Sequence, residues 1–365
     1  MVKVELNYPI GTQGQPWGDA EKKQWLESRV DHCIHQIDVV KPLFDMYRYN
    51  EKLTPMFKGL RLLNYGTLTP EKEGQEGLPL WAVMPTSFTS TAETYGITDR
   101  ELSDAEIAEA KSKPTVLITG GTHGYEKSGV MGALRFLSSG KAEKYSQFFN
   151  IVVVPCVSPW GYEKNERWTA AAIDPNRSFG RASPSSPEPL RTEESTKLMA
   201  FLDGLGIGRD GSDRDVIKWL CHIDLHETTD SDCQEFRPAK AARDGLTEYD
   251  NHIPDGFYLV GDSVNSQSEW YNAILNAVEG ATHIAEMESD NTISGYSATS
   301  RGLIEVPCKE LGLCAGGAIP KAKYVATTEV YPDSDRTTEE DCINAQVEAI
   351  CAAHDFILKK GVTLL

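Results

Sequence analysis

The sequence predicts an α/β fold in which a mixed, mainly parallel, twisted sheet is flanked by helices on both faces. Continuous apolar runs at 114–121, 148–159 and 215–227 are typical of strands that are buried on both sides. Stretches with apolar residues at helical spacing alternate with these runs, as in the segment 128–140. The chain has 365 residues, of which 40% are hydrophobic, and this length is sufficient for a large core. Strands and helices that alternate in this way build a largely parallel sheet.

The first third of the chain is expected to contain one long helix, a hairpin and a short acidic segment. The long helix is predicted from Asp19, as N-cap, to about Tyr47. Its apolar face would consist of Leu26, Val30, Ile34, Ile37 and Phe44. The apolar stretches 59–68 and 77–85 flank a polar loop that contains glycine, which predicts a hairpin. The acidic stretch 103–113 is predicted to be a short helix or a loop.

From residue 114 onward the predicted elements alternate regularly along the chain. Strands are expected at 114–121, 148–159, 215–227 and 321–332, and helices at 128–140, 187–206, 266–287 and 337–361. The last helix ends at Lys359, Lys360 and Gly361, and cations followed by a glycine are typical of a helix C-terminus.

Composition narrows the functions and the cellular location that are expected. The formal net charge of −18 would repel phosphate backbones and anionic lipids, so binding of nucleic acid or membrane is not expected. No apolar segment has the length of a signal-peptide core or of a membrane span of ~20 residues. The cysteines form no CxxC pair and favour reduced thiols in a cytoplasmic protein. They are Cys33, Cys156, Cys221, Cys233, Cys308, Cys314, Cys342 and Cys351.

Polar side chains gather at the carboxyl ends of the predicted strands, where sites form in open α/β sheets. His123 and Glu126 follow the strand 114–121, and Glu329 lies near the end of the strand 321–332. Further polar residues at such strand ends are Asn165, Arg167, Asn176, Arg177, His226 and Glu227. All of these residues therefore belong to the same end of the predicted sheet.

Residues of these types can form a hydrolytic metal site. Two neutral imidazoles and one carboxylate hold zinc and leave one position open for a water, whose pKa falls toward ~7 so that it can attack a carbonyl. A separate carboxylate must take the proton of this water. Arginines must neutralise the oxyanion and any substrate carboxylate. Alone, the HxxE spacing of His123 and Glu126 fits an ordinary polar turn as well, so the prediction depends on the whole combination.

The order of the motifs resembles that of the zinc carboxypeptidase (carboxypeptidase A-like) superfamily, near its succinylglutamate desuccinylase/aspartoacylase branch. The motifs are "GTHGYE", "NERWTAAAIDPNRSF", "DLHE" and "TTEVYP", followed by a C-terminal helix. The resemblance runs from the hairpin near Gly59 to the end of the chain. It implies a zinc-hydrolase catalytic domain over residues 56–365, and residues 1–55 would form an N-terminal helical extension packed on this core.

The resemblance also implies the ligands of the metal. His123, Glu126 and His226 would ligate one Zn²⁺ per chain. Asp174, in "DPNR", would orient one of the zinc-ligating histidines. The same donor set would accept cobalt or another divalent metal in vitro.

The resemblance assigns the catalytic and substrate-binding residues as well. Glu329 would be the general base and acid, and Arg167 would polarise the scissile carbonyl. Asn176 and Arg177 would bind the carboxylate of the substrate. Glu305 also follows an apolar run, but Glu329 is the preferred base because it lies on the strand that directly precedes the final helix.

Four further residues lie near these motifs. Tyr296 is the match for the mobile tyrosine of the peptidases, although an ordinary surface loop would also explain it. Glu227 directly follows the third ligand, where the peptidases have no acidic residue, and is expected either to accept a hydrogen bond beside the metal or to face solvent. His222 and Asp224 alternate toward one face of their strand and could reach the surroundings of the metal.

The function expected from the sequence is zinc-dependent hydrolysis of a peptide or amide bond next to a free carboxylate, as in metallocarboxypeptidases. The substrate would be a small peptide or an N-acyl amino acid, so an N-acyl amino acid deacylase is the alternative. A non-catalytic zinc-binding module is an alternative of another class. A nucleotide-binding protein is disfavoured because "GGTHG" lacks both the P-loop ending and the GxGxxG spacing. The sequence leaves the oligomeric state open.

Overall fold

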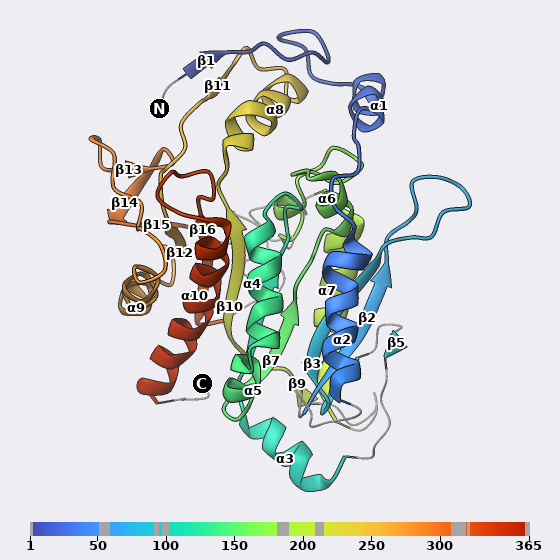
Figure 1. The fold of residues 1–365 in the computed structure, drawn as a ribbon, viewed down its shortest axis with the longest axis vertical. Helices are drawn as coiled ribbons and strands as arrows, with labels where there is room; N and C mark the ends of the chain where they lie inside the picture. Colours follow the sequence, from blue (N-terminus) through green and yellow to red (C-terminus); the bar gives the residue numbers. More distant parts are fainter. Residues whose placement is uncertain are drawn as a thin grey trace.

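The computed structural model describes residues 3–50, 59–90, 95–96, 102–180, 190–208, 215–307, 319 and 322–361 (Figure 1). Its main sheet has the strand order β13-β14-β15-β12-β16-β10-β6-β7-β3-β2-β5. These strands are β13 (Thr292–Ile293), β14 (Tyr296–Ser300), β15 (Leu303–Val306), β12 (Tyr258–Asp262), β16 (Tyr324–Val330), β10 (Trp219–Glu227), β6 (Thr115–Gly120), β7 (Asn150–Val154), β3 (Pro79–Pro85), β2 (Leu60–Thr67) and β5 (Tyr95–Gly96).

Two smaller sheets and the helices complete the fold. One small sheet pairs β1 (Lys3–Glu5) with β11 (Glu248–Asp250), and the other joins β4 (Phe88–Ser90), β8 (Leu205–Ile207) and β9 (Asp215–Val216). The α-helices are α1 (Asp19–Glu27), α2 (Lys41–Asn50), α3 (Asp104–Ser112), α4 (Lys127–Ser138), α5 (Lys141–Ser146), α6 (Pro159–Lys164), α7 (Glu193–Asp203), α8 (Arg237–Arg243), α9 (Ser268–Val278) and α10 (Glu339–Lys359). Short π- or 3₁₀-helical turns are η1 (Gln36–Val40), η2 (Pro175–Arg177) and η3 (Asp232–Phe236).

The centre of the main sheet is parallel. Strands β16, β10, β6 and β7 run side by side in the same direction. Strand β12 pairs antiparallel with β16 but parallel with β15, and β3 pairs antiparallel with both β7 and β2. The carboxyl ends of the central strands point toward the top of Figure 1, beneath α8 and the β1–β11 pair. The predicted mixed sheet with helices on both faces is therefore confirmed, but among the described strands parallel pairing is confined to the central strands and to β12 with β15.

Alternate side chains of the central strands point to opposite faces of the sheet and pack into two apolar layers. On β6, Val116 and Ile118 pack on the face covered by α2, α4, α9 and α10, whereas Leu117 packs on the opposite face with residues of α6 and α7. The residues of β7 divide between the two layers in the same way. Because both faces are covered, β6 and β7 are mostly apolar on both sides and show no regular polar alternation.

The predicted hairpin is present as the antiparallel pair β2 and β3, and the acidic stretch forms α3. The helix expected at 266–287 is shorter, because α9 ends at Val278 and the chain turns at Gly280. The helix expected at 187–206 begins only at Glu193, with Thr192 as its N-cap.

The single helix expected from Asp19 to Tyr47 is wrong. Helix α1 ends at Glu27, and helical structure resumes only at Gln36. Between them, the backbone N–H groups of His32 and Cys33 donate hydrogen bonds to the carbonyl of Glu163, which draws the chain out of the helical path. The expected apolar face is consequently split. Val30, Ile34 and Ile37 are more than half exposed, and Trp25, Val39, Val40 and Leu43 are buried instead.

The described part of residues 1–55, called the N-terminal region below, contacts several elements of the rest of the chain. Strand β1 pairs with β11, and α2 packs against β2 and α4. The expected boundary at residue 55 lies outside the described residues, as do Cys308 and Cys314. The other six cysteines are free thiols, of which Cys156, Cys221, Cys342 and Cys351 are buried. None of the described helices has the length and apolar character needed to cross a membrane.

Candidate metal centre

Three parallel strands bring the predicted ligands and the predicted base together. His123 and Glu126 lie in the turn between the end of β6 and the start of α4, and His226 is the penultimate residue of β10. Strand β10 lies between β6 and β16, and its register aligns His226 directly with Glu329 of β16. Side chains that are distant in the sequence therefore meet at one sheet edge, as the strand-end rule requires.

Gly124 allows the turn that carries the first two ligands to pack tightly. Its backbone N–H donates a hydrogen bond to the carbonyl of Glu166, at 3.0 Å. A Cβ atom at position 124 would lie 1.8 Å from the carbonyl carbon of Gly161 and 2.0 Å from the nitrogen of Tyr162. Two glycines therefore let the ligand turn rest directly on the backbone of α6.

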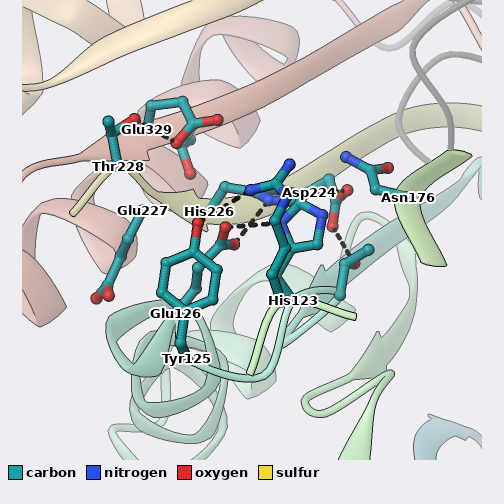
Figure 2. A network of polar contacts seen from close by, with 12 residues as sticks. His123, Tyr125, Glu126, Asn176, Asp224, His226, Glu227, Thr228 and Glu329 are labelled. Atoms are coloured by element: carbon teal, nitrogen blue, oxygen red, sulfur yellow. Dashed lines mark hydrogen bonds and ion pairs between the residues drawn. The ribbon is translucent and has the colours of Figure 1, made fainter. Parts of the chain in front are cut away.

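The three predicted ligands converge on one point (Figure 2). Nδ1 of His123 lies 2.7 Å from Oε1 of Glu126, and Nδ1 of His226 lies 2.7 Å from Oε2 of the same carboxylate. One ligand atom from each residue lies within 4.8 Å of the other two. All three side chains are buried.

The other nitrogen of each imidazole is held by a carboxylate. Nε2 of His123 lies 3.0 Å from Oδ1 of Asp174, and Nε2 of His226 lies 2.7 Å from Oδ2 of Asp224. A neutral imidazole in either place carries its proton on Nε2 and presents the lone pair of Nδ1 to the centre. Asp174, which the resemblance assigns to orienting a ligand histidine, thus contacts His123.

Asp224 is the partner that the sequence did not assign. It shares one face of β10 with His226, two residues away, and its Oδ1 accepts hydrogen bonds from the hydroxyls of Thr119 and Thr122, at 2.6 and 3.1 Å. His222 continues the same face and contacts the Thr119 hydroxyl at 2.9 Å. The alternation of His, Asp and His along one strand face was the available signal.

The donor set fits a divalent cation. Oε2 of Glu126 is buried and accepts no hydrogen bond within the described part of the chain, although Nδ1 of His226 is 2.7 Å away. Burial lowers the pKa of His226, but the charges of Glu126 and Asp224 raise it well above its ordinary value. Burial likewise opposes ionisation of Glu126, whose pKa is nevertheless lowered by His226 and His123. The centre therefore favours added positive charge, and two nitrogens with one carboxylate are a zinc-type donor set.

Glu329 faces the same centre from β16. Its Oε2 accepts a hydrogen bond from the hydroxyl of Thr228 at 3.0 Å, and this hydroxyl also contacts the phenol of Tyr258 at 2.9 Å. Burial raises the pKa of Glu329 to about 8, with smaller opposing and reinforcing effects of His226 and Glu126. A carboxyl with a pKa near neutrality can both take and return a proton. Glu305, the other candidate, does not line the cavity, whereas both of its neighbours on β15 do.

Arg167 lies beside the first ligand and is held from two directions. Its Nε lies 3.2 Å from Oδ2 of Asp174, and its Nη1 lies 3.5 Å from Oδ1 of Asp232. The hydroxyl of Tyr125 accepts from the same Nη1 at 3.0 Å and donates to Asp232 at 3.0 Å. Burial disfavours the charge of Arg167, but Asp174 and Tyr125 raise its pKa well above the ordinary value. The sequence did not identify Tyr125 or Asp232 as parts of this arrangement.

Glu227 accepts a hydrogen bond at the start of α4, two residues after Glu126, and is not exposed to solvent. Its side chain is buried, and its Oε1 accepts a hydrogen bond from the backbone N–H of Ser128 at 2.6 Å. It therefore satisfies one of the free N–H groups at the start of α4. Burial raises the pKa of Glu227 to about 8.

A cavity of about 850 Å³ extends outward from this centre. His123, Arg167, Asn176, Arg177 and Glu329 line it, so the two predicted carboxylate-binding residues share the cavity with the metal ligands. The phenol of Tyr296, which is half exposed, lines the same cavity. Lys3, Trp17 and Lys22 of the N-terminal region also line it.

Known structures share this fold. A candidate metallopeptidase from Shewanella amazonensis aligns with a TM-score of 0.53 at 15% identity, over 87% of this chain and 92% of that chain. A second from Shewanella denitrificans gives 0.51 at 15% identity, over 86% and 88%. Carboxypeptidase A from Helicoverpa armigera gives 0.51 at 13% identity, over 91% and 75%. No family model and no curated protein matches the sequence. The chain therefore has the carboxypeptidase-like fold that the resemblance implied.

Proposed function

We propose that the protein is a zinc-dependent hydrolase that cleaves a peptide or amide bond next to a free carboxylate. One observation carries the proposal: both ligand imidazoles are anchored at Nε2 by a carboxylate, so that their Nδ1 atoms converge on Glu126 beside an in-register Glu329. A structural role alone does not require two oriented imidazoles, a buried carboxylate and a second, separately placed acid. The similarity of the fold to metallopeptidases supports the same conclusion.

His123, Glu126 and His226 would hold the ion. Zinc in such a site polarises a carbonyl and activates a water as nucleophile. Glu329 would take the proton of the attacking water on its carboxylate and deliver it to the leaving nitrogen as the C–N bond breaks. Its burial, which raises its pKa, keeps both protonation states accessible near neutral pH.

Arg167, Asn176 and Arg177 would bind the substrate. The guanidinium of Arg167 is fixed by Asp174 and Asp232, so it can donate hydrogen bonds to a developing oxyanion without reorganising. Asn176 and Arg177 lie two and three residues after Asp174 and line the same cavity, which suits them to a substrate carboxylate. A peptide with a free C-terminus and an N-acyl amino acid both carry this carboxylate. Deacylation of N-acyl amino acids by the same mechanism is therefore the alternative activity.

Metal analysis and hydrolysis assays test the proposal together. We expect about one zinc per chain in the purified protein, and its loss in His123→Ala. We expect Glu329→Gln to retain zinc but to lose at least ~10²-fold in kcat, because only the proton transfer is removed. Assays with blocked dipeptides and with N-acyl amino acids would separate the two substrate classes. A zinc-loaded wild type that hydrolyses neither class would favour the non-catalytic module, and unchanged turnover in Glu329→Gln would exclude Glu329 as the base.

A further inference from the structure

Arg29, in the loop after α1, lies between two loops of the candidate site. Its Nη1 is 2.7 Å from Oε2 of Glu166 and 3.2 Å from Oε1 of Glu235. The guanidinium also lies over the ring of Trp25, 5.3 Å from its centroid. The side chain is only 17% exposed, and that of Glu166 is 3% exposed, so this is a largely desolvated ion pair.

Both carboxylates belong to loops that hold Arg167. Glu166 precedes Arg167, and its Oε1 accepts a hydrogen bond from the backbone N–H of Arg167 at 3.1 Å. Glu235 lies in η3 together with Asp232, which contacts the Arg167 guanidinium. The side chain of Arg29 therefore joins the backbone position of Arg167 to the turn that carries one of its two carboxylate partners.

We propose that Arg29 is a positioning residue for Arg167 and that the N-terminal region is thereby a working part of the substrate site. This inference rests on the proposed role of Arg167 in binding the oxyanion. Arg167 is held by Asp174 from its own loop and by Asp232 from η3. The relative placement of these two loops therefore sets the position of the guanidinium, and Arg29 ties the loops together.

The electrostatics of Glu166 explain why Arg29 matters there. Burial raises the pKa of Glu166 to about 7, although Arg29 and the N–H of Arg167 favour its ionised form. The charged and titratable groups around it are Arg29, Glu235 and Tyr8, whose hydroxyl donates to Glu235 at 2.8 Å. Without Arg29, Glu166 would be an uncompensated buried charge or a protonated acid, and either state changes its contact with Arg167.

The kinetic test compares Arg29→Met, Arg29→Lys and the control Lys23→Met. Lys23 lies in α1 and makes an exposed ion pair with Glu27. We expect Arg29→Met to lower kcat by about 10–100-fold with KM changed less than about threefold, since a shift of ~1 Å in an oriented group can cost ~10²-fold. Arg29→Lys should recover part of the loss because it keeps the charge. Zinc content should be unchanged in all three variants, and Lys23→Met should behave as wild type.

A pH profile and a crystal structure separate positioning from a general loss of stability. In Arg29→Met the pKa of Glu166 should rise further, so the kcat defect should vary with pH, and the added substitution Glu166→Gln should remove that variation. The crystal structure of Arg29→Met should show the Arg167 guanidinium displaced from Asp174 or Asp232. If Arg29→Met does not fold, Arg29→Lys and Glu166→Gln carry the same measurements.

The outcomes distinguish this inference from the proposed function. If wild type is active and Arg29→Met matches Lys23→Met in kcat, Arg29 has no positioning role. If the wild type hydrolyses no substrate, the proposed function is wrong. The crystal structure of Arg29→Met then still shows whether Arg29 holds Arg167 in place. An unmoved Arg167 in Arg29→Met would overturn the inference in either case.

Discussion

Replacing Gly124 with alanine should displace the turn that carries two of the three proposed ligands. The added Cβ would lie 1.8 Å from the carbonyl carbon of Gly161 and 2.0 Å from the nitrogen of Tyr162, whereas real Cβ contacts are essentially never shorter than 3.0 Å. These opposing atoms are backbone atoms of α6 and cannot rotate away. The turn and α6 must therefore separate by more than about 1 Å, even for the closest permitted contact.

The separation is large relative to the tolerance of a metal site. Ligand distances must hold to about ±0.2 Å, so a shift of more than about 1 Å next to His123 should weaken zinc binding by at least ~100-fold. The overpacking itself should cost about 3 kcal/mol. For 365 residues and an unfolding entropy of ~2.1 cal/mol/K per residue, this cost lowers Tm by about 4 °C before any effect of metal.

We would measure zinc affinity by competition with a chelator and Tm by calorimetry. Both measurements would be made on Gly124→Ala and on the control Gly280→Ala. Gly280 has open surroundings, since its added Cβ would only approach the carbonyl oxygen of Ala277 at 3.5 Å. The control should keep wild-type zinc affinity and Tm. If Gly124→Ala also keeps both, the close approach of the ligand turn to α6 is refuted as a requirement of the site.

Substitutions at two other positions test the surroundings of the site and a buried acid outside it. Asp224→Asn should weaken zinc binding by about 10-fold and Asp224→Ala by up to ~100-fold, because each weakens the anchor of His226 Nε2; chelator competition measures both, and equal affinities would remove Asp224 from the site. Burial raises the pKa of Glu194 from 4.5 to about 7, so the folded chain retains a proton that the unfolded chain releases. The stability contributed by this group is therefore present below pH ~4.5 and is lost as pH rises through ~7, by roughly 3 kcal/mol in total. Urea unfolding should show Glu194→Gln gaining stability relative to wild type between pH 5 and pH 8, and a constant difference would contradict the assignment.

Local patterns were sufficient to predict the fold class and the end of the sheet that carries the site. The predicted strands at 114–121 and 215–227 contain β6 and β10, and both of these strands are buried along nearly their whole length. His123, Glu126 and His226 could then be placed by the rule that parallel strands end at a common edge. The position of a residue just after a strand is enough to place it at this edge, because each strand runs uninterrupted to its carboxyl end.

The N-terminal region shows where local patterns mislead. Helical spacing of Val30, Ile34 and Ile37 predicted a buried face, yet all three are more than half exposed. The helix is interrupted because two backbone N–H groups, those of His32 and Cys33, donate hydrogen bonds to the carbonyl of Glu163, which is distant in the sequence. Such a long-range hydrogen bond cannot be predicted from the spacing of apolar residues in the segment that it interrupts.

The sequence by itself therefore determined the parallel sheet, the strand ends and the residue types available there, because each depends on short-range periodicity and on continuous strands. Only the tertiary structure decided which side chains orient others. The helix-capping role of Glu227 and the link from Arg29 through Glu166 to Arg167 depend on contacts between segments that are distant in the sequence. Such contacts are set by how the loops pack against one another, and the chemical type of a residue does not specify the partner that packing brings to it.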